Sequence, residues 1–109
     1  MAWNVKIFQT SNGKYPVKEF IQKQDEVTQA KIAHSILLLK NNGPFLKPPF
    51  IKKLQSGVYE LRIQGKNALR ILYTMYNNEY YLVHAFKKKT QKMPQSEIKT
   101  AVDRIKELI

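Results

Sequence analysis

The sequence predicts an α+β fold: two N-terminal helices, an antiparallel β-sheet of three to four strands, and a C-terminal helix. Two observations support this class. Residues 58–64, 68–76 and 79–86 read as strands separated by short polar turns. Apolar residues recur at helical spacing both before and after this block. The chain has 109 residues and no internal linker, so we expect a single domain spanning 1–109.

The N-terminal part is expected to hold a short strand and a surface helix. Val5 to Phe8 has the composition of a strand, and Pro16 suits the first turn of a helix. A single apolar stripe predicts that this helix lies on a surface; its positions are Val17, Phe20, Ile21 and Gln24.

A second helix is expected from about Asp25, as its cap, to Lys40. It has a broad apolar face, formed by Val27, Ala30, Ala33, Ile36, Leu37 and Leu39. The sequence Asn41 to Pro44 should end it, because a glycine can adopt a left-handed cap and a proline follows. Residues 45–50 are rich in proline and are expected to form a connector.

The turns set the expected register of the three strands. Asn77-Asn78 suits a two-residue hairpin, which places Tyr76 opposite Glu79. The same register places Arg70 opposite Ala85 and Ile71 opposite His84.

For the first turn, a two-residue loop sets Arg62 opposite Leu69, whereas a three-residue loop at Gly65-Lys66-Asn67 sets Arg62 opposite Arg70. We prefer the second, because it collects the apolar side chains on one face. That face comprises Tyr59, Leu61, Ile63, Leu69, Ile71, Tyr73, Leu82, His84 and Phe86.

The last helix should begin near Pro94 or Ser96. Its apolar positions follow the helical period, at Ile98, Ala101, Val102, Ile105, Leu108 and Ile109.

Composition limits the function classes. There is no cysteine, which excludes disulfides, iron–sulfur clusters and thiolate zinc sites. The net charge of +11 favours a polyanionic partner, although a solubilising face would give such lysine runs as well. No segment is apolar enough to span a membrane and the N-terminus is not a signal peptide, so a cytoplasmic protein is expected.

The preferred register gathers cations on the second face of the sheet. Arg62, Arg70 and Lys87 are expected there, with Lys52 and Lys53 at one edge and the segment Lys87–Lys89 with Lys92 at the other. Opposed arginines repel, so an anion is expected between them. Two alternatives stay open: Arg62 pairs with Glu60 on the same face, or Arg70 merely extends over Leu72.

The sequence offers few other catalytic groups. It has no metal-ligand cluster and no glycine-rich phosphate loop. His34 is expected to be packed or half exposed on the second helix, and His84 is interpreted as a structural histidine on the core face. A nuclease built from these residues would use preorganised positive charge to stabilise the phosphoryl oxygens while a ribose 2′-hydroxyl attacks.

The ordered set of motifs resembles the HigB-like branch of the RelE/ParE toxin superfamily. It includes Gly57-Val58-Tyr59-Glu60-Leu61-Arg62, Arg70-Ile71-Leu72-Tyr73, the segment from His84 to Pro94, and Ile98, Ala101 and Arg104. The resemblance implies a toxin of a type II toxin–antitoxin pair that cleaves messenger RNA, usually on the ribosome. Together with the lack of a metal-ligand cluster in the sequence, it predicts a metal-independent endoribonuclease without a cofactor. It also implies an antitoxin partner, often with a helix-turn-helix domain.

The resemblance matches Arg62, Arg70 and the segment Lys87–Lys89 to basic positions of the family, and the other candidate lysines follow from the charge pattern. The catalytic candidates are Arg62, Arg70, Lys87 and Lys89, and the RNA-binding candidates are Lys52, Lys53, Lys66, Lys88 and Lys92. A tyrosine that some relatives carry near the last helix has no counterpart between Thr90 and Ile109, so the proton-transfer group stays open. Two other functions remain as alternatives: a ParE-like inhibitor of DNA gyrase without nuclease activity, and a plain RNA-binding module.

Overall fold

The computed structural model describes residues 2–55, 57–65 and 67–109 and confirms the α+β class. Within these residues the strands are β1 (Val5–Ile7), β2 (Ile51–Gln55), β3 (Val58–Arg62), β4 (Leu69–Tyr76) and β5 (Glu79–Lys87). The helices are α1 (Pro16–Gln22), α2 (Glu26–Asn42) and α3 (Gln95–Leu108), with a 3-10 turn η1 (Gly43–Phe45) after α2. The strands form one sheet in the order β1-β5-β4-β3-β2.

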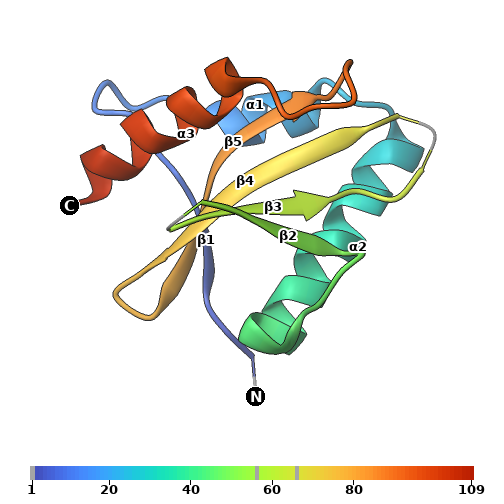
Figure 1. Ribbon diagram of the computed structural model, residues 1–109, viewed down its shortest axis with the longest axis horizontal. Coiled ribbons are helices and arrows are strands. Elements are labelled where there is room, and N and C mark those ends of the chain that lie inside the picture. Colours follow the sequence, from blue (N-terminus) through green and yellow to red (C-terminus); the bar gives the residue numbers. More distant parts are fainter. Residues whose placement is uncertain (1, 56, 66) are drawn as a thin grey trace.

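The sheet is antiparallel except at one edge, where β1 runs parallel to β5. Helices cover both of its faces: α3 lies over one, and α2 lies across the other (Figure 1). We call these the α3 side and the α2 side. The central strands β3 and β4 therefore have few exposed positions.

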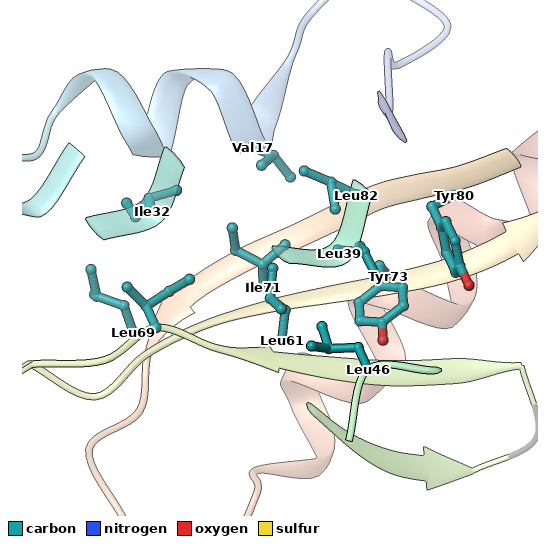
Figure 2. Close-up of a cluster of buried hydrophobic side chains, with 11 residues drawn as sticks. Val17, Ile32, Leu39, Leu46, Leu61, Leu69, Ile71, Tyr73, Tyr80 and Leu82 are labelled. Carbon is teal, nitrogen blue, oxygen red and sulfur yellow. The ribbon is translucent and has the colours of Figure 1, made fainter. Parts of the chain in front are cut away.

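The larger apolar cluster fills the α2 side (Figure 2). It combines side chains of α1 and α2 with alternate residues of β3, β4 and β5, and adds Leu46 after η1 and Ile63 just beyond β3. The full set is Val17, Ile32, Leu39, Leu46, Leu61, Ile63, Leu69, Ile71, Tyr73, Tyr80 and Leu82. A second cluster packs under α3 and comprises Phe8, Val58, Leu72, Val83, Phe86 and Ala101.

Both predicted helix boundaries of α2 have identifiable causes. The Asp25 carboxylate accepts a hydrogen bond from the Thr28 backbone N–H at 2.7 Å, which confirms the predicted cap and lowers the pKa of Asp25. At the other end α2 continues to Asn42, two residues beyond the prediction, and Gly43 has φ +51°. A Cβ at Gly43 would clash with the Trp3 ring, so a glycine is needed here both for its positive φ and for the lack of a side chain.

Strand β2 is absent from the prediction, which assigns residues 45–50 to a connector and gives no element between residues 51 and 57. Residues 51–55 carry two adjacent lysines and little apolar alternation. The strand is nevertheless stable at the sheet edge, where lysines are tolerated because one side of the strand meets solvent.

The register of β3 and β4 is confirmed: Arg62 lies directly opposite Arg70. The Asn77-Asn78 turn is also confirmed, with positive φ at both residues and Tyr76 opposite Glu79. Of the loop that sets the β3–β4 register, Lys66 lies outside the described residues.

The predicted register between β4 and β5 is wrong beyond the middle of the hairpin. Leu72 pairs with His84 but Tyr73 pairs with Leu82, so Val83 is an extra residue, a β-bulge. Arg70 therefore faces Phe86 instead of Ala85, and Ile71 faces Ala85 instead of His84.

The bulge also changes the face of the sheet on which the later residues of β5 lie. Phe86 pairs with Arg70 and packs in the cluster under α3, and His84 contacts α3. Both had been expected on the α2 side with Leu82. One inserted residue moves every later side chain of the strand to the opposite face.

Candidate functional site

The candidate site lies on the α3 side of β3 and β4, where three charged side chains meet. Glu60 and Arg62 are two residues apart on β3 and so share a face, and Arg70 pairs directly with Arg62 from β4. Arg62 Nε donates to Glu60 Oε1 at 3.0 Å. Arg70 Nε lies 3.4 Å from Glu60 Oε2. One carboxylate therefore holds two guanidinium groups.

Glu60 is almost completely buried, with 1% of its side chain exposed, whereas Arg62 is 32% and Arg70 16% exposed. The Arg70–Glu60 contact is an ion pair without hydrogen-bond geometry, and neither Arg70 Nε nor Glu60 Oε2 has a hydrogen-bond partner among the residues that the structure describes. Arg70 donates instead from Nη1 to the Leu69 carbonyl at 3.0 Å. The carboxylate thus lies beneath the guanidinium groups, and these reach the surface.

Glu60 changes the interpretation of the paired arginines. The expected anion between them is a side chain of the protein, and the alternative that Arg62 pairs with Glu60 is confirmed. Their close approach therefore needs no external phosphate. The charge balance still leaves one net positive charge, and each guanidinium has five N–H donors, of which only some are used inside the protein.

A surface hollow of about 260 Å³ lies beside the two arginines. Its lining comprises Pro49, Arg62, Ile63, Gln64, Gly65, Ala68 and Arg70. The hollow is open to solvent and both arginines contribute to its lining, so an anionic ligand entering it would lie beside two cationic residues.

The predicted lysines divide between the two faces. Lys52 pairs with Glu60 and shares the α3 side, but Lys53 pairs with Tyr59 on the α2 side. Lys87 pairs with Leu69 and also lies on the α2 side, so its predicted placement beside Arg62 and Arg70 is wrong. The bulge in β5 is the reason.

The remaining lysines follow the end of β5. The Lys88 backbone donates to the Ala68 carbonyl at 2.7 Å, which brings this segment beside the lining of the hollow. Lys89 and Lys92 are exposed in the segment between β5 and α3, and Lys66 lies outside the described residues. Between Glu26 and Glu79 the sequence has one acidic residue, the buried Glu60, so this part of the surface is basic.

A second polar cluster fixes α3 to β5. His84 Nε2 lies 2.7 Å from Glu97 Oε1, while Arg104 Nη1 lies 3.2 Å from His84 Nδ1 and donates to the Val83 carbonyl at 2.8 Å. Because Arg104 can only donate, His84 Nδ1 accepts and Nε2–H donates to Glu97. This is the neutral imidazole, and burial lowers the pKa of His84 in spite of Glu97.

This cluster supports the structural interpretation of His84, since both of its ring nitrogens are engaged. The sequence analysis does not predict a role for Glu97, and it names Arg104 only in the family resemblance. The spacing of seven residues between Glu97 and Arg104 could have indicated this cluster, because it places both side chains on one face of α3. Among the described residues, no three histidine or acidic side chains come together as a metal site.

The charged residues of both clusters lie in a part of the chain that matches a known protein family. The model of the phage-derived Gp49-like proteins (DUF891) matches residues 19–106, which include Glu60, Arg62, Arg70, His84 and Arg104. This match covers most of the chain. The chain belongs to the Gp49-like family. The Gp49-like proteins are a RelE-related, toxin-like family of toxin–antitoxin systems, which implies an antitoxin as partner.

The comparison with curated proteins found no match. Membership of the Gp49-like family confirms the coarser part of the predicted resemblance, a RelE-related toxin family. In the part of the chain that is described, no helix is long and apolar enough to cross a membrane.

Proposed function

We propose that this Gp49-like protein is a HigB-like, ribosome-dependent endoribonuclease that cleaves messenger RNA without a metal ion. The observation that carries the proposal is the sharing of one buried carboxylate by Arg62 and Arg70 beside an open hollow. The shared carboxylate fixes both guanidinium groups in place and leaves them with a net positive charge. Preorganised cations of this kind stabilise a charge that develops in the transition state.

In the proposed reaction the 2′-oxygen of a ribose attacks the adjacent phosphorus. The O2′–P bond forms as the P–O5′ bond breaks, so the products carry a 2′,3′-cyclic phosphate and a 5′-hydroxyl. Arg62 and Arg70 bind the phosphoryl oxygens and neutralise their growing charge. Lys52 on the same face and the Lys88–Lys92 segment beside it guide the RNA backbone.

The attacking 2′-hydroxyl loses its proton and the departing O5′ gains one, and both transfers are assigned to the exposed lysine segment, with Lys89 as the candidate. The buried Tyr73 cannot take this role, because it belongs to the cluster on the α2 side and burial raises its pKa. Tyr76 and Tyr81 pack against each other, with ring centroids 6.4 Å apart, at the opposite end of β4 and β5 from Arg70.

The test is to map message ends after adding purified protein to translating ribosomes. We expect cleavage by the wild type, with cyclic phosphate ends, and loss of cleavage by two orders of magnitude or so in Arg70→Ala. Lys99→Ala removes an exposed cation of α3 that pairs with Asp103, and should cleave normally. If messages stay intact at a protein concentration that stops growth, the nuclease proposal is wrong. Gyrase poisoning in a supercoiling assay would then favour the alternative of a ParE-like gyrase inhibitor.

A further inference from the structure

The α2 side of the sheet carries an aromatic hollow, on the face opposite Arg62 and Arg70. It has a volume of about 180 Å³ and lies at the end of β4 and β5 that contains the Asn77-Asn78 turn. Its lining is mostly apolar and comprises Gly43, Pro44, Leu46, Ile51, Tyr59, Tyr73, Met75 and Tyr80. Figure 2 shows Tyr73, Tyr80 and Leu46 together at this end of the core cluster.

Two large exposed apolar side chains belong to the lining or adjoin it in sequence: Met75 is part of the lining, and Phe45 lies between Pro44 and Leu46 of the lining. Phe45 is 71% and Met75 41% exposed, and the Phe45 ring packs edge-on against Trp3 at 6.1 Å. Exposed aromatic and methionine side chains around a concave apolar site are the composition of interface centres. We call the hollow with Trp3, Phe45 and Met75 the aromatic patch.

The charges beside the aromatic patch are positive. Lys53 pairs with Tyr59 and so lies on the same face, and the exposed Lys47 follows Leu46 of the lining. The chain has no acidic residue between Glu26 and Glu60. A partner that fits here therefore presents an apolar side chain flanked by carboxylates.

Two other occupants fit less well. A second copy of a chain with net charge +11 would bring like charges together. RNA would need free ring faces for base stacking, but Tyr59 stacks on Tyr73 at 5.5 Å and Tyr73 packs against Tyr80 at 5.7 Å.

We propose that the aromatic patch is the docking site for an acidic, amphipathic segment of the antitoxin, which inserts an apolar side chain into the hollow. The inference rests on the proposed toxin function for the identity of its partner. Because Arg62 and Arg70 lie on the α3 side, docking on the α2 side does not require either arginine.

The experiment measures binding of the protein encoded by the adjacent reading frame to the purified chain by calorimetry. Phe45→Asp combined with Met75→Asp places carboxylates where the partner's carboxylates approach, and should weaken binding by about 30-fold or more. The matched control is Leu37→Asp, a 51% exposed apolar residue of α2 outside the patch, which should bind like the wild type. Lys53→Glu should weaken binding as well, by a smaller factor.

Several outcomes would overturn the docking site. These are normal binding by the Phe45/Met75 variant, an equal loss in Leu37→Asp, or no binding of the adjacent gene product to the wild type. Self-association that the double variant abolishes, or a parallel loss of RNA affinity, would assign the patch to another occupant. Circular dichroism verifies that each variant is folded. The assay contains no RNA, so failure of the nuclease proposal would leave its result standing.

Discussion

The Glu60 carboxylate lies 3.0 Å from the Arg62 guanidinium and is almost entirely removed from water. A buried carboxylate is costly unless cations compensate its lost hydration. Arg62 and Arg70 supply that compensation from neighbouring strands, so the same three side chains stabilise the sheet and present positive charge at its surface.

The first prediction concerns removal of this carboxylate charge. Glu60→Gln keeps the side-chain size but leaves two guanidinium groups without a counter-charge. We expect a loss of about 2–3 kcal/mol in unfolding free energy, below the cost of breaking a fully buried pair because Arg62 is partly exposed. Urea denaturation measures it.

A double variant makes this prediction specific. Glu60→Gln with Arg62→Gln removes one charge of each sign, so part of the lost stability should return. The control Glu107→Gln, on the exposed surface of α3, should change stability by less than about 0.5 kcal/mol. Strictly additive losses in the double variant would show that Glu60 and Arg62 do not act as a pair.

Much of the sheet could be predicted from the sequence, because alternation and turn residues act locally. The Arg62–Arg70 pairing followed from requiring one apolar face, and the Asn77-Asn78 turn from residues that tolerate positive φ. The bulge at Val83 could not be predicted in this way, because no glycine or proline marks it. Because the bulge is missing from the predicted register, that register places His84, Phe86 and Lys87 on the wrong face of the sheet.

The candidate site could be predicted only in part, because it also depends on how the elements pack. Charge patterning identified the basic residues, but whether Glu60 is buried or exposed depends on α3 and the neighbouring strands. A sequence pattern gives the spacing of Glu60 and Arg62 on one strand. It does not show that a single carboxylate reaches Arg70 as well.

The second prediction compares two adjacent lysines of β2. Lys52 shares the α3 side with Arg62 and Arg70, whereas Lys53 lies on the α2 side. In binding of single-stranded RNA, Lys52→Gln should reduce the slope of log affinity against log salt concentration by about 0.7, the value for one lost phosphate contact. Lys53→Gln should leave that slope unchanged. Fluorescence anisotropy over a salt series measures both, and equal effects would contradict a one-sided RNA surface.

The third prediction separates steric from backbone requirements at two glycines. Gly43→Ala forces a Cβ against the Trp3 ring and also strains a positive φ, so it should cost about 2–4 kcal/mol of stability. Gly57 has φ +78° but open space around the Cβ position, so Gly57→Ala should cost only about 1–2 kcal/mol. Thermal unfolding of both variants tests the difference. Equal losses would mean that the Trp3 contact contributes nothing.

The fourth prediction is a pH dependence of stability that arises from His84. Its folded-state pKa is lowered by burial, with Arg104 acting in the same direction and Glu97 opposing. The unfolded chain therefore binds a proton more readily than the folded protein. Stability from this group is complete above the ordinary histidine pKa of about 6.5 and falls as the pH decreases through and below that value.

His84→Gln removes the titration and keeps an amide N–H that can donate to Glu97. The melting temperature of this variant should therefore fall less between pH 7 and pH 5 than that of the wild type. His34→Gln is the matched control, because His34 is exposed on α2 and is the other histidine of the chain. It should retain the wild-type pH profile. If His84→Gln instead follows the wild type across this range, the neutral histidine between Glu97 and Arg104 is not what makes stability depend on pH.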